Sequence, residues 1–134
     1  MNADRPILVV TPEPGIQAVI RYLFESQGAT VITAGDAVSA RRRIAETLPR
    51  AIVLELVLPD EDGFTFLARL QAMPRTAPVP VFLTTARIRR GDRARALRAG
   101  AADLLTRPFD ERAILDRLAE YPDRALDTPD AKAA

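Results

Sequence analysis

Residues 52–63 read IVLELVLPDEDG, and this stretch decides the fold. The apolar run 51–54 is typical of a strand that is covered on both faces of a parallel sheet. A carboxylate, Glu55, ends the run, and a turn rich in Pro, Asp and Gly leads into a helix at Asp62 and Gly63. Because ligands bind at the carboxyl ends of the strands in such sheets, Glu55 becomes a candidate site residue.

Four further apolar runs surround this one and alternate with amphipathic segments. We therefore expect strands at 7–10, 30–33, 51–54, 79–83 and 103–105. Their alternation with helices predicts an α/β fold, namely a flavodoxin-like, doubly wound sheet of five parallel strands in the order 2-1-3-4-5 with five helices. We expect the second helix to carry Val38, Ile44, Ala45 and Leu48, and the fourth to turn Ala94 and Leu97 inward.

Length and composition limit the possible functions. The 134 residues predict one domain over residues 1–120 and a flexible C-terminal tail over 121–134. Cys and His are both absent, which excludes thiol chemistry, imidazole acid–base chemistry and the usual zinc sites. The net charge is +1, no apolar run is long enough to span a membrane and no signal peptide is recognisable, so we expect a cytoplasmic protein.

Polar residues follow or end several of the expected strands. Thr11, Glu55, Thr85 and Arg107 each occupy such a position. The carboxyl ends of parallel strands lie at one edge of the sheet, so we expect these four side chains to surround a single pocket.

Three motifs in order resemble those of receiver domains from bacterial response regulators. They are residues 55–63 (ELVLPDEDG), 83–86 (LTTA) and 96–109 (ALRAGAADLLTRPF). The resemblance covers roughly residues 6–120 and implies a role in two-component signal transduction. In an active receiver an aspartate accepts a phosphoryl group, and a magnesium ion, a hydroxyl and a lysine stabilise it.

This chain departs from the family pattern at the acceptor site. Glu55 occupies the position of the acceptor aspartate, and Arg107 occupies the position of the lysine. Thr11 and Pro12 occupy the positions of the acidic metal-binding pair. Glu13 lies one residue beyond the pair, and Thr85 is retained. We expect no metal, no bound Mg²⁺ or other cofactor and no enzymatic activity. The chain is identified as a degenerate receiver, a pseudo-receiver that serves as a protein-interaction module.

Two interpretations of Glu55 and Arg107 remain open. The two side chains could form an internal ion pair that satisfies a disused cleft. Alternatively, Glu55 could imitate the phosphorylated state by accepting hydrogen bonds from Thr85 and Arg107. A different function, phosphotransfer to Glu55 or Asp60, is the alternative to a pseudo-receiver.

An arginine cluster offers a candidate partner surface. The resemblance places Arg89, Arg90, Arg93, Leu104 and Thr106 near the face through which receivers meet their partners. We expect a protein partner in a signalling pathway, with acidic character. The simpler alternative is a solvated helix surface. Nucleic-acid binding through the arginine-rich fourth helix is the least favoured, because the net charge is near zero and no aromatic residues are interleaved. The oligomeric state is left open.

Overall fold

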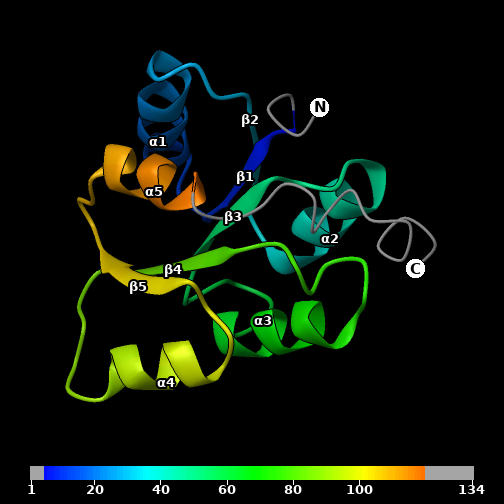
Figure 1. Cartoon of the computed structure of the whole chain (residues 1–134), viewed down its shortest axis with the longest axis vertical. Coiled ribbons are helices and arrows are strands. Elements are labelled where there is room, and N and C mark those ends of the chain that lie inside the picture. The colour runs from blue at the N-terminus through cyan, green and yellow to red at the C-terminus, as the bar shows by residue number, and fades with distance from the viewer. Residues whose placement is uncertain (1–4, 120–134) are drawn as a thin grey trace.

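The computed structural model describes residues 5–119, so the expected tail over 121–134 lies outside the described residues. Five parallel strands form one sheet in the order β2-β1-β3-β4-β5, which confirms the predicted fold class (Figure 1). The strands are β1 Ile7–Val10, β2 Val31–Ala34, β3 Ala51–Glu55, β4 Val81–Thr85 and β5 Asp103–Thr106. The helices are α1 Pro14–Ser26, α2 Ala37–Glu46, α3 Gly63–Ala72, α4 Asp92–Arg98 and α5 Glu111–Leu118.

The helices cover both faces of the sheet (Figure 1). Phe24 of α1 and Ile114 of α5 pack on one face, against alternate strand residues such as Val53 and Phe82. The other face packs against α2, α3 and α4. Side chains alternate between the two faces along each strand, so the position of a residue in its strand decides which helices it meets.

Several strand boundaries differ from the sequence prediction. β4 begins at Val81, because Pro80 has no N–H for the ladder and contributes only its carbonyl, which accepts from the Ile52 N–H at 3.0 Å. It extends to Thr85, where it pairs with Thr106 at the end of β5. β3 likewise includes Glu55, so the carboxylate belongs to the last strand residue. The site residues are therefore held by the sheet itself.

The buried faces of two helices differ from the prediction, wholly in α4 and in part in α2, where Ile44 is buried as expected. In α4, Leu97 is 49% exposed and Ala94 is exposed, whereas Ala96 is fully buried. In α2, Val38 and Ala45 are exposed. The buried residues of α2 are Ala37, Ala40 and Ile44. The Asp36 side chain accepts from the Ser39 N–H at 2.7 Å and so begins the helix at Ala37.

Within the part of the chain that the structure describes, no helix has the length and apolar content that a membrane span requires.

Candidate functional site

Glu55 lies at the carboxyl edge of the sheet and is almost fully buried. Its Oε1 atom forms an ion pair with Nη1 of Arg107, which follows β5. The same oxygen accepts a hydrogen bond from Thr84 Oγ1 at 3.4 Å. Glu55 and Thr84 are direct partners in the β3–β4 register, so their side chains project toward the same face of the sheet. The structure thus brings Glu55 and Arg107 together, as expected from the sequence.

The environment of Glu55 acts on its acidity in both directions. Burial raises the pKa of the Glu55 carboxyl above its ordinary value, and the nearby negative charge of Glu13 acts in the same direction. The positive charge of Arg107 and the hydrogen bonds from Thr84 and Arg107 oppose this effect without cancelling it. The carboxylate therefore depends on Arg107 for its charged form.

Thr85 does not contact Glu55. Its Oγ1 donates to the Arg87 carbonyl at 3.3 Å and accepts from the Arg87 N–H at 3.4 Å. The interpretation in which Glu55 accepts hydrogen bonds from both Thr85 and Arg107 therefore does not hold for Thr85. Alternation along β4 directs Thr84 toward the face of Glu55 and Thr85 toward the opposite face. The pairing of Glu55 with Thr84 is set by the register of β4 against β3 in the folded sheet, and the motifs of the sequence did not point to Thr84.

The start of α1 completes the edge of the site. Thr11 follows β1 and is 3% exposed, and its Oγ1 atom has no hydrogen-bond partner among residues 5–119. Pro12 and Glu13 are exposed, and Pro14 is the first residue of α1. Among residues 5–119, no group of three or more Asp and Glu side chains is placed so that it could bind a metal ion.

Asp60 lies in the loop between β3 and α3, and its side chain accepts hydrogen bonds from the start of α2. Its two carboxylate oxygens accept from the N–H groups of Ala37 at 2.9 Å and Val38 at 3.1 Å. These hydrogen bonds, with that of Ala37 the largest cause, lower the pKa of Asp60. Asp60 therefore ties this loop to the beginning of α2.

The same loop requires a glycine where it enters α3. The Gly63 N–H donates to the Leu56 carbonyl at 2.7 Å, and a Cβ atom at position 63 would lie 2.8 Å from the Leu56 Cα. Only glycine permits this close approach of two backbone segments. The glycine of the Asp-Gly pair in the sequence motif is therefore required for steric reasons.

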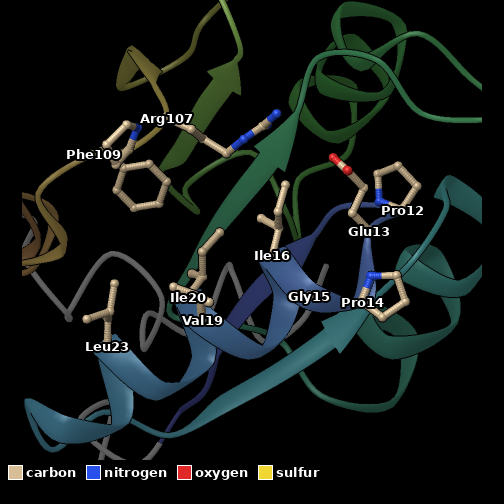
Figure 2. A pocket seen from close by; sticks show the side chains of 11 residues that line it. Pro12, Glu13, Pro14, Gly15, Ile16, Val19, Ile20, Leu23, Arg107 and Phe109 are labelled. Atoms are coloured by element: carbon tan, nitrogen blue, oxygen red, sulfur yellow. The ribbon is translucent and has the colours of Figure 1, made fainter.

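A groove of about 760 Å³ runs along α1, beside the site formed by Glu55 and Arg107 (Figure 2). Its walls are largely apolar and are formed by Ile16, Val19, Ile20, Leu23, Pro108 and Phe109. Arg107 and Glu13 contribute its charged side chains, so the groove begins next to the site of Glu55. This groove was not predicted from the sequence, although the apolar face of α1 indicated part of it.

The predicted partner residues divide between surface and core. Arg89 and Arg90 are exposed, and Thr106 is partly exposed. Arg93 is half-exposed but donates to the Leu104 carbonyl at 3.0 Å and pairs with Asp103 at 3.4 Å. Leu104, which was predicted as a partner-binding residue, is fully buried and so is not on the surface where Arg89 and Arg90 lie. Its register with Leu83 places it under α4, in the core.

Comparisons with known proteins identify the family. The family model for the response regulator receiver domain matches residues 7–119. A protein of Leptolyngbya boryana, described as an uncharacterized 14.6 kDa protein in the sodA1 3′ region, is 33% identical over 89% of this chain and 91% of its own length. The Escherichia coli phosphate regulon transcriptional regulatory protein PhoB is 34% identical over 85% of this chain and 50% of its own length.

Other relatives are also longer than this chain. The DNA-binding dual master transcriptional regulator RpaA of Synechocystis is 35% identical over 84% of this chain and 46% of its own length. This chain therefore spans about half the length of the two transcriptional regulators that it matches.

Solved structures share the fold. The receiver domain of Francisella response regulator 1452 has a TM-score of 0.78 and 25% identity, covering 90% of this chain and 98% of that one. Vibrio cholerae chemotaxis protein CheY4 also has a TM-score of 0.78, with 20% identity, and the match covers 90% of this chain and all of that one. From these motifs, this sheet and these relatives, the chain belongs to the family of response regulator receiver domains of two-component signalling.

Proposed function

We propose that this receiver domain works without phosphorylation, as a protein-interaction module whose acceptor pocket is closed by its own ion pair. One observation carries the proposal. Arg107 and Thr84 hold the same oxygen of Glu55, the residue at the acceptor position. The cation and one hydroxyl next to the acceptor are thus already bound to a carboxylate of the chain itself.

The chemistry of phosphoryl transfer supports this proposal. The reaction needs a carboxylate nucleophile and a metal ion that neutralises the developing charge. Magnesium requires hard oxygen ligands in near-octahedral geometry. Thr11 and Pro12 supply no carboxylate, and Glu55 is paired with Arg107. The residues present do not fit a magnesium site, so the proposed function includes no metal, no cofactor and no catalysis.

The geometry favours an internal ion pair over imitation of the phosphorylated state. Imitation would require Glu55 to bind Thr85, and the hydroxyl of Thr85 instead bonds to the backbone of Arg87. One carboxylate also carries a single negative charge, whereas a phosphoryl group carries nearly two and has three acceptor oxygens. Under this proposal the pair fills the cleft and maintains one conformation of the domain.

Asp60 does not offer a second acceptor site under this proposal. Both of its carboxylate oxygens accept from the backbone of α2, which orders the loop between β3 and α3. Phosphorylation there would break these hydrogen bonds, so the contacts of Asp60 oppose the alternative of phosphotransfer. The output of the domain would then come from a protein partner in a cytoplasmic signalling pathway.

Amide NMR spectra recorded during addition of Mg²⁺ and then beryllium fluoride test the proposal. Beryllium fluoride imitates a phosphoryl group on a carboxylate. We expect no shifts at Thr11, Glu55, Thr84 and Arg107 in the native chain. Saturable, Mg²⁺-dependent shifts at these residues would overturn the proposal.

A reconstructed acceptor site provides the positive control. The variant T11D/P12D/E55D/R107K restores the acidic pair, the aspartate and the lysine of the family pattern. We expect this variant to show the saturable response that the native chain lacks. The comparison separates an inactive pocket from a probe that fails under the conditions used.

A further inference from the structure

The groove along α1 has the size and composition of a small-molecule site. Its volume of about 760 Å³ lies within the range of about 300–1,000 Å³ that is typical of such sites. Its walls are apolar side chains of α1 and of the segment between β5 and α5. Val19, on the α1 wall, is 58% exposed, so no other part of residues 5–119 covers this surface. Contiguous apolar surface that stays exposed commonly marks a binding site.

Both walls of the groove are fixed to the core of the domain. Ile20 and Phe24 of α1 are buried against the sheet and hold the first wall in place. Phe109, on the opposite wall, packs against the same core cluster (Figure 2). From Ile16 to Leu23 the apolar wall extends for about 10 Å along the helix axis. A ligand that enters a site with fixed walls orders few additional side chains, so little of its binding free energy is lost.

One end of the groove carries an excess of negative charge. Figure 2 shows Glu13 at the end of the groove opposite Leu23. Glu13 is exposed, and its carboxylate forms no ion pair and caps no backbone N–H inside residues 5–119. Arg107 also lines the groove but is already paired with Glu55. Two carboxylates and one guanidinium give this end a net charge of −1, which favours a cation.

We propose that the groove binds a small amphipathic cation, whose apolar body lies along α1 and whose protonated amine lies at Glu13. The apolar walls and the unpaired carboxylate each select one part of such a molecule. An anionic ligand would be repelled by Glu13, and a neutral ligand would gain nothing from it. Such binding goes beyond the proposed function and is independent of it, because it requires neither phosphorylation nor a protein partner.

Amide NMR titrations of the full chain with octylammonium, octan-1-ol and octanoate test the proposal, because these probes share one apolar chain and differ in charge. We expect octylammonium to cause saturable shifts at Ile16, Val19, Leu23 and Phe109. Octan-1-ol should bind at the same residues about two- to fivefold more weakly, which is the contribution of an exposed ion pair, and octanoate more weakly still. The preference for octylammonium should decrease at high ionic strength, which screens the charge of Glu13.

Two pairs of variants separate the charged contact from the apolar one. Glu13→Gln should weaken octylammonium binding by about two- to fivefold and leave octan-1-ol binding unchanged. Glu46→Gln, which removes an exposed carboxylate of α2, should change neither. Val19→Ser removes part of the apolar wall and should weaken the binding of all three probes by about threefold. Val38→Ser is its control, because Val38 is similarly exposed on α2, and should leave binding unchanged.

Several outcomes would overturn the proposal. They are the absence of saturable shifts in the groove, equal affinity for octylammonium and octanoate, and a loss in Glu13→Gln no larger than that in Glu46→Gln. Shifts spread over the whole domain would also overturn it, because they would show that the probe unfolds the protein. Shifts at groove residues that follow the protein concentration without any probe would replace the small molecule with a second copy of the chain.

Discussion

Replacing Arg107 with methionine tests whether the ion pair stabilises the pocket. Methionine preserves much of the length of the side chain and removes its charge. Glu55 would then keep one hydrogen bond, from Thr84, and would lose its positive partner. A buried carboxylate without a counter-charge is strongly destabilising.

The burial of the two partners sets the size of the effect. Removing one partner of a fully buried ion pair costs about 3–5 kcal/mol. Glu55 is 8% exposed and the Arg107 side chain is 21% exposed, so water reaches part of the pair. We therefore expect Arg107→Met to lower the free energy of unfolding by about 2–3 kcal/mol at neutral pH.

The loss of unfolding free energy in Arg107→Met should increase with pH. Burial raises the pKa of Glu55 and Arg107 opposes this effect, so the pKa rises further in Arg107→Met. The folded variant then binds a proton more tightly than the unfolded chain. The contribution of Glu55 to the stability of the variant is greatest below the ordinary glutamate pKa of about 4.3 and is lost as pH rises through the folded pKa. The deficit relative to the native chain should therefore be small in acid and full at neutral pH.

Urea unfolding followed by circular dichroism measures these free energies. Arg112→Met is the matched control, because it removes the same type of charge from an exposed pair with Asp116, at 3.6 Å, and should cost less than about 0.5 kcal/mol. Adding Glu55→Gln to Arg107→Met should recover much of the loss and yield the coupling energy of the pair. The reasoning is refuted if Arg107→Met costs no more than Arg112→Met, or if its cost is the same in acid and at neutral pH.

Five other substitutions, two of which are controls, test the geometry of the fold around the site. Gly63→Ala should destabilise the domain by about 2 kcal/mol or more in urea unfolding, because the added Cβ would clash with the Leu56 backbone. Gly15 has no atom within 4 Å of an added Cβ, so Gly15→Ala should be neutral or stabilising by up to about 1 kcal/mol. Similar effects at both positions would contradict this steric explanation. Asp60→Asn should lower the melting temperature at neutral pH, because it removes a carboxylate that binds the backbone of α2. A group with a lowered pKa contributes stability only above that pKa, so the difference from the native chain should shrink as acid protonates Asp60. A difference in melting temperature that is constant with pH would count against the hydrogen bonds to α2. Leu104→Ala should cost about 2–4 kcal/mol in urea unfolding and Leu97→Ala less than about 1 kcal/mol, and the reverse order would show that Leu104 lies on the surface.

The fold could be predicted because its signals are local. Apolar runs such as 7–10 and 51–54 can be buried on both sides only in the interior of a sheet. The helices between them require parallel strands and crossover connections, which leaves few possible topologies. The predicted strand order is the one observed.

Helix faces were predicted less well because short helices carry a weak periodic signal. The seven residues of α4 contain Ala94, Ala96 and Leu97, and spacing does not distinguish which of them faces the sheet. The contacts of Arg93 with Asp103 and the Leu104 carbonyl, together with Arg95 over Phe64, set the rotation of the helix and turn Leu97 outward. These contacts join residues that local sequence patterns do not relate.

The sequence by itself determined that a carboxylate ends β3 and that a cation follows β5, because both positions belong to contiguous motifs. Only the tertiary structure decided which hydroxyl reaches that carboxylate. Thr84 and Thr85 are adjacent and chemically identical, but the register of β4 against β3 pairs Thr84 with Glu55. Alternation then sends the Thr85 side chain to the opposite face of the sheet. Register arises from packing between strands that are distant in the chain, so the residues around Thr84 and Thr85 do not by themselves show which hydroxyl lies next to Glu55.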